Sequence, residues 1–520
     1  MNVTIAPNEP VELRSLELTN YGLEEETIDV TSYLEPVLST MSQDYSHPAF
    51  NNLFLSYEYL EERNAILVQR RNRNEKEIPI YLGAMLYTEN KTTGDLEYEI
   101  DKEKFYGRNG FQIPRVVENS IPFSKQIQYT TDPIISFKRT ITIQPEETVK
   151  LNLIIAVGHD KGQVQENLKY FSNQETIKHS FELEKAKIEA ENRYLGVKGK
   201  QLEFYQKMLG YLLLQNPLKK LQYTQTMDLP VAKLWEYGIS GDLPILLCKV
   251  KTTEDIEILN QLLKFYYYFH IKNILFDFVI IDEEKYSYNS NVKEEITSSI
   301  VNENLSYLQN SKGGIFVLEN LEKQEKEFLE YRANLSIPAN CGSLYRYIKE
   351  LEEEFRYHVK EMPSEEPYHA IEETKPIREP LENLKYDNEY GGFLQDGKEY
   401  HIRMNKEQTL PTIWSHLLVN ENFGTLVTET MGGYTWHKNS RLNRLTAWHN
   451  SQVTDEPSEV IFMQDLENKK VWSLGFNPCP DENDYHITYG FGYAKYQHSS
   501  KEFSEEVEMF IPMEQPVKVQ

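Results

Sequence analysis

Two tryptophans and four polar side chains lie close together near the C-terminal end of the sequence. Between residues 436 and 448 these are Trp436, Asn439, Arg441, Asn443, Arg444 and Trp448. Sugar-binding sites stack the apolar faces of pyranose rings on aromatic side chains and bind hydroxyl groups with amides and guanidinium groups. The six residues are therefore candidates for carbohydrate contact. The alternative is a loop that packs its own aromatic side chains between two strands, and the sequence leaves both open.

A pair of carboxylates is the second candidate for chemistry. Glu236 and Asp242 lie in the segment 234–247, which reads LWEYGISGDLPILL. Paired carboxylates are the acid and base of glycoside chemistry. Nothing in the sequence, however, places both in one cleft, and Gly238 and Gly241 are typical of a turn into a strand, where Asp242 would satisfy backbone amides. We favour this structural role and assign no catalytic residue.

Composition excludes several classes of function. The formal net charge is −26, whereas binding a nucleic-acid backbone requires clustered lysines and arginines. The three cysteines, Cys248, Cys341 and Cys479, lie far apart, and the 12 histidines show no HxxxH or HExxH spacing. We therefore predict no nucleic-acid partner, no disulfide framework, no metal site and no cofactor.

Hydropathy argues against membrane insertion. The N-terminus is polar from Asn2 to Glu12, unlike a signal peptide. The most apolar stretch, 265–281, is interrupted by His270, Lys272 and Asp277 and is too polar to span a bilayer. The sequence predicts a soluble, cytoplasmic chain without a membrane span.

The first 160 residues are predicted to be all-β. The clearest pair of strands lies around a turn at 145–147. The first strand contains Ile141 and Ile143, and the second follows the turn. Alternation in that second strand places Val149, Leu151, Leu153, Ile155 and Val157 on one face, while Ile154 and Ala156 make its end apolar on both faces.

The middle of the chain changes character twice. Residues 161–235 are predicted to be a helical linker segment. Residues 236–360 alternate between strands at 243–250, 274–281 and 314–318 and helices at 253–270, 292–308, 321–335 and 344–359, which indicates a small parallel α/β domain. The acidic, proline-rich stretch 361–385 is a linker candidate, and residues 386–520 are again β-like. The fold class is α+β multidomain, with antiparallel β-sandwich portions at both ends.

The two ends of the chain resemble each other. Residues 5–13 read IAPNEPVEL and residues 511–519 read IPMEQPVKV, with isoleucine, proline and valine at matching positions. A chain whose end matches its beginning is typical of one period of a tandem array. Both ends are then expected to cut through copies of the same domain.

Four longer strings carry a resemblance to a known family. They are HPAFNNLF at 47–54, WEYGISGDLPI at 235–245, GYTWHKNSRLNRLTAW at 433–448 and FGYAKYQHSS at 491–500. Together, and in this order, they resemble the cyclic β-1,2-glucan synthases and the related cellobiose-phosphorylase-like glycoside phosphorylases. The resemblance covers essentially the whole chain.

The resemblance implies an architecture. Residues 1–160 become the C-terminal half of a β-supersandwich, and residues 386–520 become the N-terminal half of a second one of carbohydrate-binding type. In the family the general acid is an aspartate in an Asp-Trp motif of a helical toroid after the second sandwich. None of the five tryptophans here follows an aspartate. The expectation is the central portion of a larger enzyme, without its catalytic domain and without its membrane-embedded transferase region.

Three functions remain open. The favoured one is a non-catalytic, carbohydrate-binding portion of a β-glucan-processing glycosyltransferase or phosphorylase. Its partners would be a β-glucan or oligosaccharide and the separately encoded remainder of the enzyme. The alternatives are an active glycosyltransferase or glycoside phosphorylase acting on β-glucans, and a non-functional truncated reading frame. Two arrangements are also open: the end portions dock into one complete sandwich, or they stay apart with exposed sheet faces.

Overall fold

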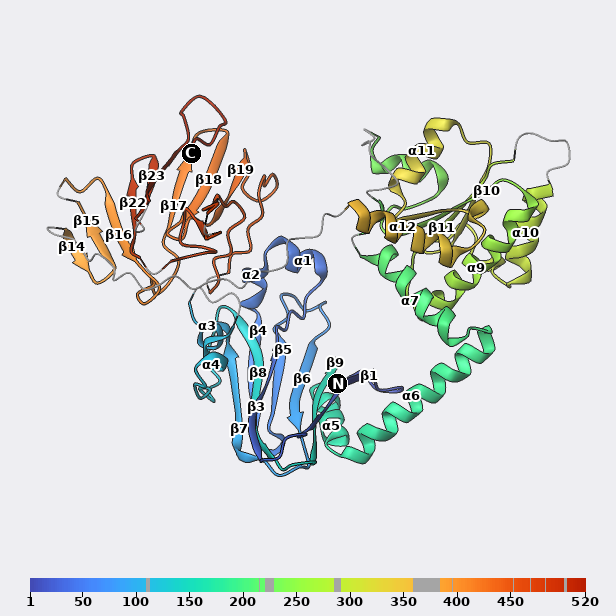
Figure 1. Cartoon of the computed structure of the whole chain (residues 1–520), viewed down its shortest axis with the longest axis horizontal. Helices are drawn as coiled ribbons and strands as arrows, with labels where there is room; N and C mark the ends of the chain where they lie inside the picture. The colour runs from blue at the N-terminus through green and yellow to red at the C-terminus, as the bar shows by residue number, and fades with distance from the viewer. Residues whose placement is uncertain are drawn as a thin grey trace. The chain divides into compact units, whose positions relative to one another are not determined.

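The computed structural model describes residues 1–108, 113–214, 216–219, 229–284, 291–358, 384–394, 396–451, 453–467, 469–481, 483–499 and 503–520. The chain forms two compact units. The first, here called the β unit, combines Met1–Lys185 with Pro367–Gln520, and the second, the α/β unit, is Ala186–Glu366. Figure 1 shows the elements of each. Most of the predicted linker at 361–385 lies outside the described residues.

Residues 1–158 of the β unit, the N-terminal β portion, form two antiparallel sheets. The larger has the order β1 (Asn2–Ile5), β2 (Val11–Thr19), β9 (Thr148–Gly158), β6 (Ile80–Tyr87), β5 (Ala65–Arg70), β4 (Leu55–Leu60). The smaller has the order β3 (Glu26–Leu34), β8 (Pro133–Ile143), β7 (Thr93–Asp101). Short helices α1 (Met41–Ser46), α2 (Pro48–Asn52), α3 (Lys102–Tyr106) and α4 (Arg115–Glu118) connect the strands.

Strand β9 explains how this portion packs. Val149 and Leu151 face the smaller sheet and join the core between the two layers. Ile154 and Ala156 point the other way, into a second cluster with Val164 and Leu168 of α5 (Lys161–Phe171). The predicted apolar character of both faces at the end of this strand is therefore confirmed. Val157 lies on the same face of the continuous strand as Val149 and Leu151, as predicted, but at the end of the strand its side chain is 37% exposed.

The predicted pairing of the strands around the turn at 145–147 is also wrong. β8 pairs with β3 and β7, whereas β9 pairs with β2 and β6. The connection between them crosses from one sheet to the other. Ile143 and Val149 both face the core between the sheets. A short turn can therefore connect two strands of different sheets just as it can connect two paired strands of a hairpin.

Residues 384–520, the C-terminal β portion, are likewise antiparallel. One sheet has the order β14 (Lys385–Asn388), β15 (Gly391–Phe393), β16 (Tyr400–Met404), β22 (Tyr485–Gly490), β23 (Tyr493–Ser499), β24 (Ser504–Phe510). A second comprises β17 (Ser415–Val419), β18 (Phe423–Thr428) and β19 (Gly433–His437), and β20 (Phe462–Gln464) pairs with β21 (Val471–Ser473). Ile487 of the first sheet and Val427 of the second meet in one core.

The two β portions keep separate sheets and separate cores in the described part of the chain. Of the two arrangements left open, the one in which both portions share a sheet or a core does not occur among the described residues, although both portions belong to one compact unit. Each portion buries apolar side chains between layers of its own. Loops carry the contacts between them instead: Arg108 reaches Glu429, and Ser451 reaches Asp132.

The similar chain ends adopt the same local pairing. Thr4 pairs with Leu13 between β1 and β2, and Phe510 forms a bridge with Val519 at the matching positions. In both segments the residue after the shared proline closes a turn with its backbone amide: Val11 to Glu9 and Val517 to Gln515. The likeness of the two sequences thus corresponds to one local backbone structure.

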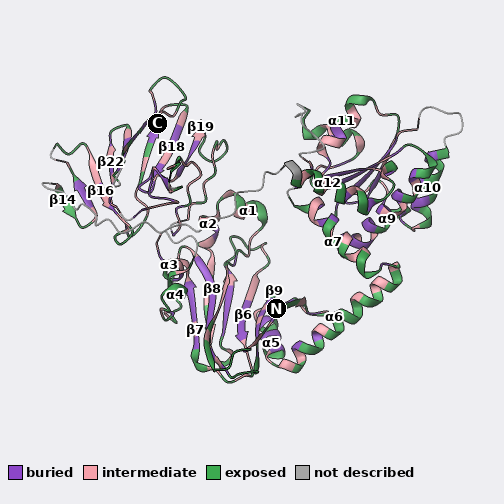
Figure 2. Ribbon diagram, in the orientation of Figure 1, coloured by how far each residue is buried: buried purple, intermediate pink, exposed green. Residues whose placement is uncertain are grey.

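The α/β unit is a three-layer structure around a parallel sheet. The order is β12 (Ile315–Leu318), β11 (Asp277–Asp282), β10 (Ile245–Val250), β13 (Leu335–Pro338). Leu246 and Phe278 face a cluster that includes α7 (Gly199–Leu213), α9 (Ile256–His270), α10 (Asn291–Asn302) and α12 (Leu344–His358). Alternate residues such as Val279 face α11 (Lys323–Arg332) and the 3-10 helix Val231–Tyr237. Figure 2 shows these strands as buried.

The predicted helices and strands of this unit are largely confirmed, with one omission. The predicted helix at 321–335 ends at Arg332, and Leu335–Pro338 forms the fourth parallel strand. The predicted helical linker contains α5, α7 and the long helix α6 (Gln174–Leu195). Along most of its length α6 is exposed (Figure 2), with only Ile177 and Ser180 buried. None of the described helices is long and apolar enough to cross a membrane.

Candidate functional site

The candidate residues at 436–448 lie on a strand and a turn that folds back beside it. β19 pairs with β18, and Trp436 then forms a bridge with Arg444. Asn439 shapes the turn, because its side-chain oxygen accepts hydrogen bonds from the backbone amides of Arg441 and Leu442 at 3.0 and 2.8 Å. Residues 433–448 are called the 433–448 hairpin below.

Three of the six candidates come together around a residue that the prediction missed. The ring of Trp448 stacks on Tyr434, with centroids 4.6 Å apart and an interplanar angle of 13°. Trp436 lies 5.1 Å from the same tyrosine. The guanidinium carbon of Arg444 is 5.7 Å from the Tyr434 ring and 5.9 Å from the Trp448 ring. Because Tyr434 and Trp436 are two positions apart on β19, strand alternation alone would have placed them on one face.

Trp436 is held in place by a glycine. Gly424 is its cross-strand partner on β18, and a Cβ atom there would lie 2.4 Å from the indole ring. The ring therefore rests directly on backbone. Trp436 and Trp448 are half-buried, so that each keeps part of its surface open to solvent.

The three remaining candidates lie on the exposed rim of the hairpin. Asn439, Arg441 and Asn443 are all exposed. The side-chain amide nitrogen of Asn443 lies 3.3 Å from Nδ1 of His437. The structure thus places half of the predicted set in an aromatic cluster and half on the polar edge beside it.

Glu459 anchors the base of the hairpin. Its Oε1 accepts hydrogen bonds from the hydroxyls of Thr435 and Thr446 at 2.6 and 2.9 Å, and Lys518 contacts Oε2 at 2.7 Å. Although burial favours the neutral acid, the bonds from Lys518 and Thr435 hold the pKa of Glu459 below its ordinary value. An ionised carboxylate therefore ties the two arms of the hairpin to the end of the chain.

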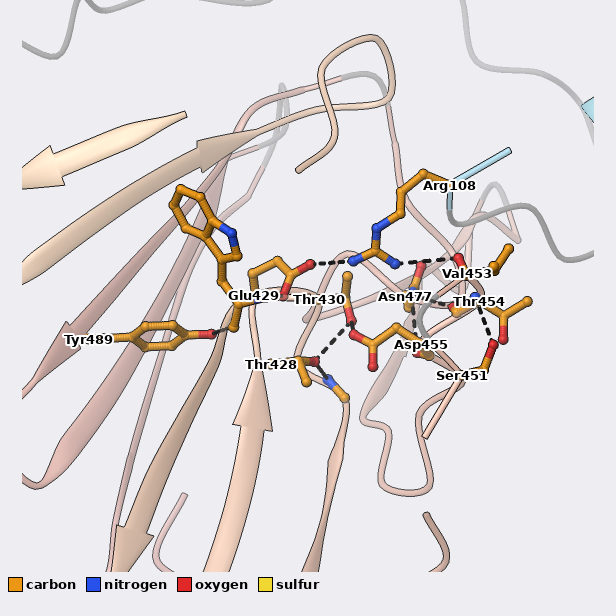
Figure 3. Close-up of polar contacts among 12 residues, drawn as sticks. Arg108, Thr428, Glu429, Thr430, Ser451, Val453, Thr454, Asp455, Asn477 and Tyr489 are labelled. Carbon is orange, nitrogen blue, oxygen red and sulfur yellow. Dashed lines mark hydrogen bonds and ion pairs between the residues drawn. The ribbon is translucent and has the colours of Figure 1, made fainter. Parts of the chain in front are cut away.

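A second buried network lies behind the loop that follows the hairpin (Figure 3). Nη2 of Arg108, from the N-terminal β portion, donates to Oε1 of Glu429 at 2.8 Å, and Nη1 donates to the carbonyl of Val453 at 3.4 Å. The other Glu429 oxygen accepts from the backbone amide of Trp414 at 2.9 Å. Asp455 accepts from the hydroxyl of Thr430.

Burial dominates the electrostatics of this network. The Glu429 side chain is fully buried and that of Arg108 is 8% exposed. Burial and the neighbouring Asp455 raise the pKa of Glu429 to about 8, against the opposing effect of Arg108. Burial likewise raises the pKa of Asp455, although Thr430 and Thr428 stabilise its carboxylate. Glu429 therefore titrates close to neutral pH.

The other carboxylate pair is dispersed. Glu236 pairs with Lys233, and Asp242 pairs with Lys312. The two carboxylate side chains are 60% and 67% exposed. Gly238 and Gly241 have φ angles of 76° and 77°, as a turn into β10 requires. Each carboxylate thus serves a surface ion pair of its own, and no group of described residues has the composition of a metal site.

Comparison with known proteins places these features in a family. The model of the family described as glycosyl hydrolase 94, supersandwich domain, matches residues 1–174 and 398–520. Both β portions are therefore matched by one domain description. The 433–448 hairpin lies within the second matched segment.

Three individual proteins are similar to the chain. The cyclic beta-(1,2)-glucan synthase NdvB of Rhizobium meliloti (strain 1021) is 25% identical over 484 residues, which cover 90% of this chain and 17% of that protein. The N,N'-diacetylchitobiose phosphorylases of Vibrio proteolyticus and Vibrio furnissii are 28% and 26% identical over 24% and 25% of this chain. Those two matches cover 15% and 16% of the phosphorylases, so the chain spans less than a fifth of each relative's length.

Proposed function

The chain belongs to the glycosyl hydrolase 94 supersandwich family, and from this premise we propose that it holds a β-glucan or related oligosaccharide on the 433–448 hairpin. The observation that carries the proposal is the cluster of Trp436, Trp448 and Arg444 around Tyr434. Its half-buried rings offer apolar surface to a pyranose face. Arg441 and Asn443 on the exposed rim supply donors and an acceptor for hydroxyl groups.

The proposed role is to hold the sugar chain, without breaking or forming glycosidic bonds. Hydrolysis of a glycosidic bond canonically uses two carboxyl groups on either side of that bond. Glu236 and Asp242 each face a lysine at the surface, and Glu429 is enclosed against Arg108. We expect phosphate-release and phosphate-consumption assays with β-1,2- and β-1,4-gluco-oligosaccharides to stay at the level of a protein-free blank.

The proposal includes a setting for this role. The relatives are a glucan synthase and two disaccharide phosphorylases, and each is much longer than the region it shares with this chain. We propose that the chain works in the cytoplasm together with the other domains of such an enzyme. Residues 1–160 and 386–520 then represent halves of two supersandwich domains, which the matching backbone pairing of the two chain ends supports.

Calorimetric titration of the full chain tests the proposal. Stacking and a few hydrogen bonds on an open surface are expected to give a Kd of roughly 1 mM, about −4 kcal/mol. Trp448→Ala and Trp436→Ala should each weaken binding at unchanged thermal stability of the α/β unit. Trp235→Ala is the matched control, because Trp235 is 67% exposed but lies in the other unit. Absence of binding, or equal binding by all three variants, would overturn the proposal.

A further inference from the structure

A cavity of about 520 Å³ lies beside the hairpin, where loops of the two β portions meet. Residues 35–37, 44, 47–50, 52–53, 102 and 131–133 line it from the N-terminal β portion, and residues 449–451, 454 and 456 line it from the C-terminal β portion. We propose that this junction groove is a second part of the carbohydrate site, so that one oligosaccharide is held by both β portions at once. The inference rests on the proposed function. It specifies in addition the length of the oligosaccharide and the residues that contact its further sugar units.

The N-terminal wall exposes apolar side chains into the groove. Val37, Phe50 and Leu53 line it and are 37%, 39% and 42% exposed. His47 caps α2 by accepting the amide hydrogen of Phe50 at 3.2 Å, which holds the backbone there. The Phe50 ring packs edge-on against Phe54, and the guanidinium carbon of Arg73 lies 5.1 Å from its centroid. An exposed ring held rigidly in a cavity is the surface on which the carbon face of a sugar packs.

The opposite wall and the floor are polar. Asn450, Ser451 and Glu456 come from the C-terminal β portion, and Asp132 directly precedes β8. The hydroxyl of Ser451 lies 3.4 Å from Oδ2 of Asp132, so the two portions meet at the floor. Burial raises the pKa of Asp132 above its ordinary value. A sugar ring has apolar C–H faces and a polar edge of hydroxyl groups. Carboxyl, amide and hydroxyl groups around an apolar surface can bind both parts.

The charge of the groove selects a neutral ligand. Its lining includes Glu35, Asp44, Asp132 and Glu456, against the single lysine Lys102. Lys102 itself contacts Glu35 at 3.0 Å. A phosphate or another polyanion would meet net repulsion here. A polyol of small-molecule size fits both the charge and the volume, since ligand cavities measure roughly 300–1,000 Å³.

The hairpin and the groove are adjacent in the sequence, although no residue of the 433–448 hairpin lines the groove itself. Trp448 precedes His449, which lines the groove. Arg444 packs near Trp448 and also donates to the carbonyl of Ser46 at 3.5 Å, at the end of α1. A sugar stacked on the hairpin therefore has the next units of its chain directed along the N-terminal wall. A disaccharide occupies the hairpin alone, and a longer chain contacts both parts.

Titration with β-gluco-oligosaccharides of increasing length tests this inference. The wild-type chain should bind longer oligosaccharides about tenfold more tightly than the disaccharide. Phe50→Ala and Asp132→Asn should remove that gain and leave the disaccharide affinity unchanged. Trp448→Ala should weaken binding of every length. Tyr21→Ala serves as the control, since Tyr21 is 83% exposed on a loop outside the groove.

The outcomes separate the two proposals. Length-dependent affinity that survives in Phe50→Ala and Asp132→Asn would overturn the junction groove while leaving the hairpin as the site. Absence of binding at every length would overturn both. Hydrogen exchange of the wild-type chain gives a readout that does not depend on the folding of variants. A long oligosaccharide should protect residues 47–53, and protection confined to the hairpin would refute the groove.

Discussion

The α/β unit and the C-terminal β portion both bury carboxyl groups, but against different partners. The main core of the α/β unit consists of aliphatic and aromatic groups such as Leu262, Phe265 and Phe278. The C-terminal β portion also buries Glu429 and Asp455, with relative exposures of 1% and 7%, together with several threonines. Burying a charged or polar group costs free energy unless it finds partners. In the α/β unit the buried Asp255, Asp277 and Asp282 accept hydrogen bonds from backbone amides. In the C-terminal β portion Glu429 also faces the guanidinium of Arg108.

The difference follows from the loops. Between β19 and β20 the chain runs from residue 438 to residue 461 without a regular helix or strand in its described residues. Backbone groups of such a segment need side-chain partners when they are buried. Asn477 binds the carbonyls of Thr454 and Asp455, and Arg108 binds that of Val453. Polar burial is thus concentrated where a loop must be held beside the proposed sugar site.

The largest expected effect is in the apolar core. Phe278→Ala removes a fully buried ring from β11, next to Tyr266 at 5.9 Å between ring centroids. The free energy of unfolding of the α/β unit should fall by about 3–5 kcal/mol. Urea unfolding followed by hydrogen exchange, which resolves the two units, measures this loss. Oligosaccharide binding should not change, and a parallel loss in the β unit would contradict the independence of the two cores.

Breaking the buried ion pair should cost less. Arg108→Met leaves Glu429 without its guanidinium partner, and roughly 3 kcal/mol of β-unit stability should be lost. We expect a loss at the low end of the range for buried ion pairs, because Glu429 has a pKa of about 8 and can take up a proton. A protonated Glu429 leaves no unpaired charge in the core. Adding Glu429→Gln should recover much of the loss. Additive losses in the double-mutant cycle would show that the two side chains do not act as a pair.

The pH dependence of the β unit sharpens the same comparison. Because the folded pKa of Glu429, about 8, exceeds its ordinary value of 4.5, the folded state binds the proton more tightly than the unfolded state. This contribution to stability is fully present below about pH 4.5 and is lost as the pH rises through 8. Melting temperatures from pH 5 to 9 should therefore decline in wild type more steeply than in Glu429→Gln. Equal slopes would assign the decline to other groups.

Local patterns in the sequence predicted much of the fold. The helical spacing in 253–270 places Ile256, Leu259, Leu262, Leu263 and Tyr266 on one face. The last four are buried on α9, and Ile256 at its first turn is half-buried. The strand at 335–338 was missed because LSIP is too short to show any periodicity, and its burial comes from pairing with β10. The sequence around the turn at 145–147 does not show whether the two strands pair with each other or belong to different sheets. The alternation of apolar and polar residues along the strands is the same in both cases.

The residues of the site that the sequence does not predict are brought together by contacts between distant parts of the chain. Glu429 and Arg108 are 321 residues apart in the chain, and no spacing rule connects them. Tyr434 lies inside the identified string, and its stacking on Trp448 depends on a turn that brings residue 448 back to β19. The prediction of Trp436, Arg444 and Trp448 used residue types alone. Types indicate a class of ligand, and only the fold determines which of the six side chains meet.

The smallest expected effect is at the exposed carboxylates of the α/β unit. Asp242 contacts Lys312 at 3.1 Å, and the two side chains are 67% and 61% exposed. Water screens such a pair, and holding two long side chains in one geometry costs entropy, so its net contribution is below about 1 kcal/mol. Asp242→Asn should leave both the urea midpoint of the α/β unit and the oligosaccharide affinity of the β unit within error. Lys312→Gln is the matched control. If Asp242 and Lys312 only form an ion pair with each other, removing either charge should have the same effect. A large loss for Asp242→Asn alone would show that the carboxylate has a role beyond its lysine, and would reopen the acid/base interpretation of this segment.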